Sequence, residues 1–220
     1  ILENPGWYTA YTPYQAEVAQ GRLEALLNYQ TVICDLTGME LSNASLLDEG
    51  TSAAEAMTML FSNRDREKVN NNCNKFFVAD DVFDQTLDVL MTRAEPLGIE
   101  IVKNSIDKIN VDKSFFGIYV QYTGKSGQIN DLKSISKAIS NFDIKLVVAA
   151  DLLSLTILEK PSLFNCDVVV GTSQRFGIPL GYGGPHAGYF ATKKQYKRSI
   201  PGRIIGVSKD TDGNLSLIHI

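Results

Sequence analysis

Residues 145–151 read Lys-Leu-Val-Val-Ala-Ala-Asp, an apolar run that ends on a carboxylate, and this stretch decides the fold. A second run, Val168-Val169-Val170, is likewise apolar throughout instead of alternating with polar residues. Unbroken apolar strands are typical of parallel sheets that helices cover on both faces. The two runs therefore predict an α/β domain with a mostly parallel central sheet.

The rest of the chain alternates short apolar runs with helical patterns, as that fold requires. A helix is expected over residues 14–36, weakened at Gly21, and a dense run of helix formers begins at Ala53. The remaining expected strands are 75–79, 100–102, 115–122, 167–171 and 188–191, and the remaining helices are 84–97 and 131–141.

Composition narrows the classes of partner. The 220 residues are 44% hydrophobic and carry 25 acidic against 21 basic groups, so neither nucleic acid nor a membrane is an expected partner. Three widely spaced cysteines form no metal-ligand pattern, so we expect no metal site and a reducing compartment. The first residue is not Met and residues 215–220 form an apolar tail, so both ends are expected to be cut.

Gly50, Thr51 and Ser52 are expected at the start of a helix, which makes them a candidate phosphate site. Free N–H groups and the helix dipole favour an anion there, and the two hydroxyls can donate hydrogen bonds. The alternative is that Thr51 or Ser52 simply caps the helix, and the pattern alone favours it.

Asp151 directly follows a strand, at the edge where parallel sheets gather their ligands. A carboxylate there can pair with a protonated pyridine nitrogen, but it can equally cap a following helix.

Residues 171–188 contain six glycines and two prolines, so this loop is expected to bind or position something. His186 lies within it and is a candidate acid or base, or a surface residue.

Several long blocks of the chain resemble the glycine decarboxylase P-protein of the glycine cleavage system. The blocks are residues 3–15 (ENPGWYTAYTPYQ), 20–24 (QGRLE), 27–31 (LNYQT), 43–51 (NASLLDEGT), 175–179 (RFGIP), 183–188 (GGPHAG) and 201–208 (PGRIIGVS).

The resemblance implies an incomplete large domain of the fold-type-I pyridoxal-phosphate (PLP) transferases. It assigns residues 1–214 to the N-terminal half of the P-protein and leaves residues 215–220 as a tail outside the family. The family's enzyme decarboxylates glycine on pyridoxal 5'-phosphate and passes the aminomethyl group to the lipoyl arm of the H-protein. Expected partners are therefore the lysine-bearing C-terminal half or subunit and the lipoylated H-protein, with glycine as substrate. The location is cytoplasmic for a bacterial source and the mitochondrial matrix for a eukaryotic one.

The chain departs from the family's lysine-bearing half at the residue that would bind the cofactor covalently. The resemblance places Gln174 at the position of that lysine, and an amide nitrogen cannot form a Schiff base. Asp151 matches the ring-nitrogen position, and residues 50–52 match the phosphate loop, so a degenerate pocket is expected. This half is then expected to support assembly and active-site formation, and to be inactive alone. The residues expected to contact substrate or partner are Trp7, Tyr11, Tyr14, Gln15, Gly183, Gly184 and His186.

Two other functions stay open at this point. One is an independent aminotransferase-like enzyme that uses Lys193 or another lysine for its cofactor. The other is a non-catalytic protein that keeps the fold and binds only a partner.

Overall fold

The structure is a computed structural model that describes residues 3–4, 13–182, 184 and 187–220. Within that part the α-helices are α2 (Gln20–Thr37), α3 (Glu49–Ser62), α4 (Arg66–Asn70), α5 (Asp84–Ala94) and α6 (Leu132–Ile139). The strands are β1 (Leu41–Ser42), β2 (Lys75–Ala79), β3 (Glu100–Asn104), β4 (Phe115–Gln121), β5 (Lys145–Ala149), β6 (Val168–Thr172), β7 (Gly188–Thr192), β8 (Ile205–Lys209) and β9 (Leu215–His219). The 3-10 helices are η1 (Ala16–Val18), η2 (Glu95–Leu97), η3 (Ile106–Lys108), η4 (Ser140–Phe142), η5 (Ser154–Thr156), η6 (Pro161–Phe164), η7 (Gln174–Phe176) and η8 (Lys194–Tyr196).

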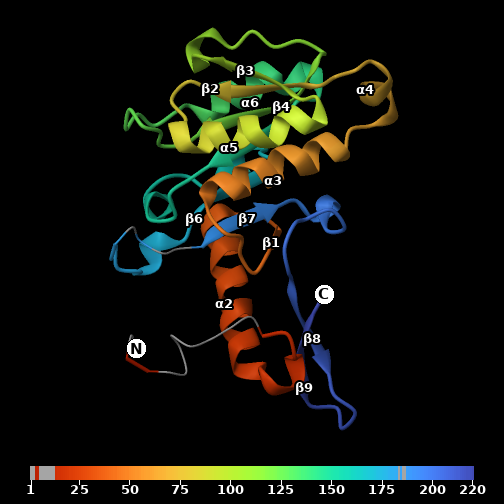
Figure 1. The fold of residues 1–220 in the computed structure, drawn as a ribbon, viewed down its shortest axis with the longest axis vertical. Coiled ribbons are helices and arrows are strands. Elements are labelled where there is room, and N and C mark those ends of the chain that lie inside the picture. Colours follow the sequence, from red (N-terminus) through yellow and green to blue (C-terminus); the bar gives the residue numbers. More distant parts are fainter. Residues whose placement is uncertain (1–2, 5–12, 183, 185–186) are drawn as a thin grey trace.

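A mixed sheet forms the centre of the described chain, in the order β1-β7-β6-β5-β4-β2-β3 (Figure 1). The strands from β6 to β3 are all parallel to their neighbours, whereas β7 runs antiparallel to both β6 and β1. The prediction of an α/β fold with a mostly parallel sheet is confirmed.

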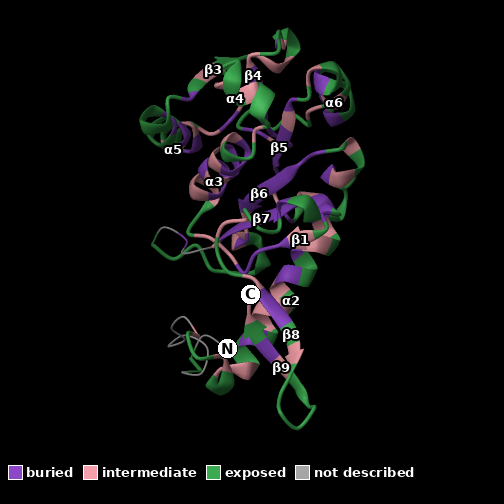
Figure 2. Cartoon of the chain, turned by 90° about the vertical axis from the view of Figure 1, so that its right-hand side faces the viewer, coloured by how far each residue is buried: buried purple, intermediate pink, exposed green. Residues whose placement is uncertain are grey.

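Helices cover both faces of the sheet, which explains why its strands are apolar throughout. Helices α3 and α5 lie on one face and α6 on the other (Figure 2). Every residue of β4 is buried, and so are the second to fifth residues of β5. Burying such runs on both faces removes a large apolar area from water, the main term that favours folding.

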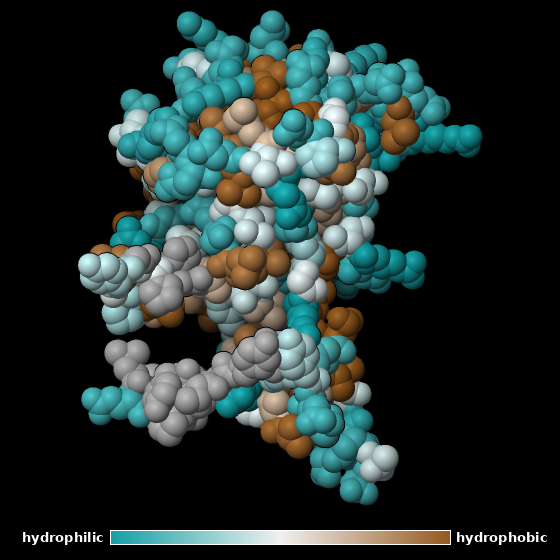
Figure 3. All heavy atoms as spheres, viewed as in Figure 1, coloured by the Kyte–Doolittle hydropathy of each residue, from teal (hydrophilic) through white to brown (hydrophobic). Residues whose placement is uncertain are grey.

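A second body of structure extends from the sheet along α2 and carries the β8–β9 hairpin (Figure 1). The space-filling view of the same face shows that hydrophilic residues predominate on it (Figure 3). Two glutamines of α2 bind backbone groups of the hairpin, and each side-chain amide both accepts and donates a hydrogen bond. Gln30 accepts from Ile205 N at 2.8 Å and donates to Ile205 O at 3.1 Å. Gln20 makes the same pair with Leu217, at 2.8 and 2.9 Å. The two amides thus satisfy strand groups as a neighbouring strand would.

The helix expected over residues 14–36 is shorter than the sequence pattern indicates. Its first turn is the 3-10 helix η1, and the backbone leaves helical geometry at Ala19, with φ −119° and ψ 24°. The spacing of apolar residues could not predict this break, because it carries no information on the Gln20 side chain. That side chain donates to Ala16 O and to Leu217 O. The break is therefore at Ala19 and not at Gly21, which lies inside α2.

Strands β1, β8 and β9 were not expected from the sequence. Strand β9 consists of Leu215–His219, and every one of these residues pairs with β8. No helix of the described chain is both long and apolar enough to cross a membrane.

Candidate functional site

The carboxyl edge of the parallel strands gathers most of the described residues that the sequence marks as a site. Asp151 follows β5 and Gln174 follows β6, and β5 and β6 are neighbouring parallel strands. Helix α3 begins against the same region, because its Asp48 and Ser52 pack on Gly188 at the start of β7. The structure therefore brings together Asp151, Gln174 and the N-terminus of α3.

The N-terminus of α3 is capped by Asp48, rather than by Thr51 or Ser52 as the simpler alternative proposed. The Asp48 carboxylate accepts from Thr51 N at 2.6 Å, which an extended Asp48 backbone allows. Both the backbone N–H and the hydroxyl of Ser52 donate to Asp48 O, at 3.0 and 2.8 Å. Thr51 N, Ser52 N and the Ser52 hydroxyl, three of the donors expected to hold a phosphate, are thus already bonded within the chain.

A second carboxylate lies in the same first turn. Glu49 accepts a hydrogen bond at 2.8 Å from Gln121, the last residue of β4. Tyr119 and Tyr189 are fully buried nearby, and burial, with Glu49 as the next cause, raises the pKa of both phenols well above the ordinary value. Two carboxylates at one helix N-terminus satisfy the helix dipole and oppose a further anion.

Asp151 is held from two directions. Its Oδ1 accepts from Leu153 N at 2.8 Å, closing a tight turn after β5. Its Oδ2 contacts Nε of Arg175 at 3.0 Å, in an ion pair whose side chains are 28% and 51% exposed. The position of Asp151 in the sequence could indicate the turn after β5. It could not indicate the ion pair, because Arg175 follows β6, the next strand along the chain.

Gln174 opens η7 and holds the glycine-rich loop by its side chain. Its Nε2 donates to Ile178 O at 3.0 Å, and its backbone N donates to the Thr172 hydroxyl at 3.2 Å. The loop turns at Gly177, whose φ of +111° strongly favours glycine. Phe176 contacts the ring of Tyr29 edge-on, with 6.2 Å between centroids, so α2 supports the loop.

The residues expected to contact a partner are only partly described. Trp7, Tyr11, Gly183 and His186 lie outside the described residues. Tyr14 is 61% exposed, and the guanidinium of Arg203 lies 4.7 Å from its ring centroid; Gln15 precedes η1, and Gly184 has φ +68°. Tyr14 and Gln15 belong to the segment beside the β8–β9 hairpin and not to the carboxyl edge, since the His219 ring contacts Pro13 O at 2.6 Å. Among the described members of the set, Tyr14 and Gln15 therefore lie in the segment beside the hairpin, whereas Gly184 belongs to the glycine-rich loop.

These residues do not fit a pyridoxal phosphate. A cofactor of this kind needs an amine for its aldehyde, a free carboxylate for its ring nitrogen and donors for its phosphate. Here Gln174 offers an amide and Asp151 is paired with Arg175. Thr51 N donates to the Asp48 carboxylate, and the Ser52 hydroxyl donates to the Asp48 carbonyl oxygen.

Lys193, the alternative amine, lies at the wrong edge of the sheet. It follows the antiparallel strand β7, so it lies beside the start of β6, where its Nζ contacts Asp167 at 2.9 Å and Asn165 Oδ1 at 3.1 Å. Asp151 follows the carboxyl end of β5. The strands separate the two groups, so Lys193 cannot serve a cofactor held by Asp151.

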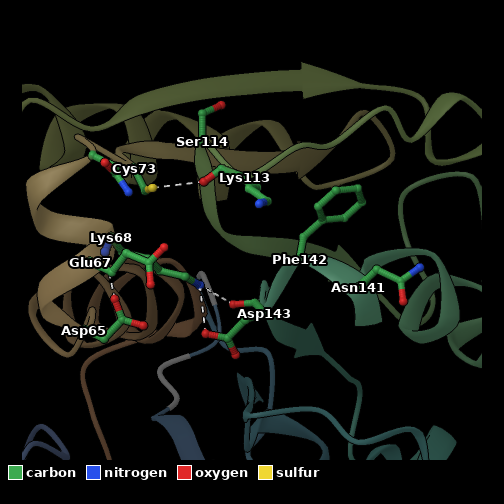
Figure 4. A pocket seen from close by; sticks show the side chains of 10 residues that line it. Asp65, Glu67, Lys68, Cys73, Lys113, Ser114, Asn141, Phe142 and Asp143 are labelled. Atoms are coloured by element: carbon green, nitrogen blue, oxygen red, sulfur yellow. Dashed lines mark hydrogen bonds and ion pairs between the residues drawn. The ribbon is translucent and has the colours of Figure 1, made fainter.

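A cavity of about 470 Å³, lined mainly by polar residues, opens at that opposite edge, before the first residues of β2, β4 and β5 (Figure 4). Lys68 closes one side of it by contacting the carbonyl oxygen of Asp143 and, at 3.1 Å, its Oδ2. Cys73 donates to Lys113 O from another side, at 2.9 Å. Among the described residues, no group of three or more His, Cys, Asp or Glu is placed to hold a metal ion. The cavity thus lies away from the edge where the fold gathers ligands.

Comparison with known protein sequences shows which family this chain resembles. The family model for the glycine cleavage system P-protein matches residues 1–219. The chain is 60% identical over 218 residues to a glycine dehydrogenase (decarboxylating) of Flavobacterium johnsoniae, covering 99% of this chain and 23% of that protein. Its counterpart in Nostoc sp. is 56% identical over 217 residues, with 99% of this chain and 22% of that protein covered. The chain therefore spans less than a quarter of the length of these relatives.

Comparison with solved structures shows a similar fold in the same family. A crystal structure of glycine decarboxylase (P-protein) in inhibitor-bound form superposes with a TM-score of 0.90 at 33% identity, covering 99% of this chain and 49% of that one. A protein described as an O-acetylhomoserine (thiol)-lyase of Campylobacter jejuni, with a pyridoxyl-lysine monophosphate, superposes at 0.62 over 86% of this chain and 48% of that one; at 14% identity it shows the fold alone. The chain belongs to the glycine cleavage system P-protein family.

Proposed function

We propose that this chain is part of the N-terminal half of a glycine dehydrogenase (decarboxylating), and that it supports the active site without carrying the cofactor. The observation that carries the proposal is Gln174, an amide placed after β6 in a chain 60% identical to a protein of that name. The complete enzyme would use pyridoxal 5'-phosphate, bound by the lysine of the other half. Its further partner would be the lipoyl arm of the H-protein, which takes up the aminomethyl group left after glycine loses carbon dioxide.

The carboxyl edge of the sheet offers a surface for contact with the lysine-bearing half. Leu153 and Ile157 follow β5 with 53% and 87% exposure, and Leu180 follows β6 with 72%. Phe176 and Ile178 of the same loop are 48% and 42% exposed. Apolar side chains gathered at one edge mark an interaction surface. We assign it to the lysine-bearing half, whose active site this edge would then help to enclose.

The proposal is tested by glycine-dependent exchange of labelled bicarbonate in the full-length protein with H-protein present. Leu180→Glu places a charge on the proposed contact and is expected to lower exchange at least about tenfold, because an unpaired charge in an interface is costly. Leu163→Glu is the matched control, since Leu163 is 69% exposed in η6 and lies two residues before Asn165, which contacts Lys193 at the opposite edge. Equal activity of the two variants would contradict the contact.

Deletion of residues 13–182 from the full-length protein distinguishes the proposed function from the remaining alternative, a non-catalytic protein that only binds a partner. Exchange that persists without them would leave a binding or scaffolding role for this chain. Exchange that disappears, while the other half still binds its cofactor, supports a structural half of the enzyme.

A further inference from the structure

We infer that the chain has filled both charged ends of its family's cofactor cradle with its own side chains, Asp48 at the phosphate end and Arg175 at the ring end. The missing lysine is then only one of three barriers to the cofactor. The inference rests on the family fold and not on the proposed function.

At the ring end, Arg175 takes the part of a protonated pyridine nitrogen. A cation facing Asp151 is what this position requires, and Nε of Arg175 supplies it at 3.0 Å from Oδ2. The other carboxylate oxygen is bonded to Leu153 N. Because Arg175 adjoins Gln174 in η7, an amine installed at position 174 would still find the ring's counter-charge occupied.

At the phosphate end, the Asp48 carboxylate occupies the place of the anion, because it accepts from Thr51 N. The backbone N–H and the hydroxyl of Ser52, which is completely buried, donate instead to the Asp48 carbonyl oxygen. Glu49 adds a second negative charge in the same turn. A phosphate would have to displace bonded groups and approach two carboxylates, which like-charge repulsion opposes.

Backbone packing keeps this end closed. An added methyl group on Gly188 would lie 2.2 Å from Asp48 O and 2.4 Å from Ser52 Oγ, so β7 begins directly against the capped turn. The Ser52 hydroxyl would have to give up its hydrogen bond to Asp48 O before it could donate to a ligand.

Arg175 and Asp48 act in the same sense. The ring end holds a cation where the cofactor would bring one, and the phosphate end holds an anion where the cofactor would bring another. Each end is thereby neutralised from within, and the fold keeps its charge balance with no ligand.

The test is attachment of pyridoxal 5'-phosphate to the full-length protein, fixed with borohydride and located by peptide mass. Gln174→Lys alone is expected to leave residues 171–180 unlabelled. Gln174→Lys combined with Asp48→Ser and Arg175→Ala is expected to label that peptide at least about tenfold more, because both opposing charges are gone. Serine at position 48 still caps α3, so the helix start is retained.

Controls and contrary outcomes are defined by the same peptide map. Gln195→Lys, an exposed position in η8, gives the background for any newly placed lysine. Labelling of Gln174→Lys above that background and equal to the triple variant would mean that the lysine is the only barrier, and would overturn the inference. A folded triple variant labelled no more than background would overturn it equally. Should the triple variant fail to fold, two double variants replace it: Gln174→Lys/Arg175→Ala tests the ring end and Gln174→Lys/Asp48→Ser tests the phosphate end. For each end, labelling above that of Gln174→Lys supports the inference, and labelling no higher contradicts it. Glycine turnover is not measured, so this inference and the proposed function can fail independently.

Discussion

Arg175 and Asp151 meet across the carboxyl edge of the sheet, with 3.0 Å between Nε and Oδ2, although strand β6 lies between them in the chain. The contact joins the turn after β5 to the start of the glycine-rich loop. It fixes where the loop begins, while Gln174 and the Phe176–Tyr29 contact fix how it continues. The pair therefore positions the loop more than it stabilises the fold.

Arg175→Gln is expected to change the free energy of unfolding by less than about 1 kcal/mol, because half-exposed ion pairs are screened by water and salt. Local hydrogen exchange over residues 174–182 should nevertheless accelerate, since the loop loses its first anchor. Mass spectrometry of the exchanged full-length protein measures both. Arg198→Gln, at an exposed arginine, is the control and should leave the loop unchanged. A loop equally protected in both variants would show that the pair positions nothing.

Gln30→Ala is expected to release the β8–β9 hairpin from α2. The buried amide satisfies both Ile205 N and Ile205 O, and each orphaned buried group costs about 1–3 kcal/mol. Hydrogen exchange of residues 205–219, followed by mass spectrometry, should accelerate much more than hydrogen exchange of the central sheet. Gln128→Ala, at an exposed glutamine, is the matched control. Slow exchange of the hairpin in Gln30→Ala would contradict the anchoring role.

Gly188→Ala and Gly21→Ala are expected to act in opposite directions. A methyl group on Gly188 would overlap Asp48 O, and overpacking of this kind costs about 1–3 kcal/mol or more. Gly21 is the second residue of α2 and has nothing within 4 Å of an added methyl group, so alanine there should stabilise by at most about 0.5–1 kcal/mol, the value for the middle of a helix. Thermal unfolding of the two variants checks the sign of each change. Destabilisation by Gly21→Ala, or tolerance of Gly188→Ala, would count against the packing described.

Asp143→Asn is expected to flatten the loss of stability at acid pH. Burial acts to raise the pKa of Asp143, but hydrogen bonds and charges of Lys145 and Lys68 outweigh it and lower that pKa. A lowered folded pKa contributes stability above the unfolded value of about 3.9 and loses it as pH falls through the folded value. Asparagine tolerates the left-handed backbone at this position, φ +50°, so the turn is retained.

Unfolding of the wild-type protein and of Asp143→Asn should therefore be compared from pH 7 down to about pH 3, near and below the unfolded carboxyl pKa. Other acidic residues contribute to both curves and cancel in the difference. The gap between the curves should narrow below about pH 4, where the carboxylate takes up its proton. A constant gap across the range would contradict the assignment.

Much of the sheet could be predicted because its signal is local. Val168-Val169-Val170 and residues 146–150 are apolar for a reason that each strand carries by itself, namely burial on both faces. The antiparallel direction of β7 could not be predicted, because Gly188–Thr192 reads the same whichever way it pairs. The cap at Asp48 was missed, although an aspartate just before a run of helix formers is a preferred N-cap residue and could have indicated it.

The sequence by itself determined the α/β fold, the P-protein family and the absence of an amine at Gln174. These follow from residue types and their order along the chain. Only the tertiary structure decided that Arg175 faces Asp151, that Asp48 and Gly188 close the start of α3, and that Gln20 and Gln30 hold the β8–β9 hairpin. The physical reason is that most of these contacts join segments distant in the chain, and folding alone sets the separation of such groups and the charge that each one meets.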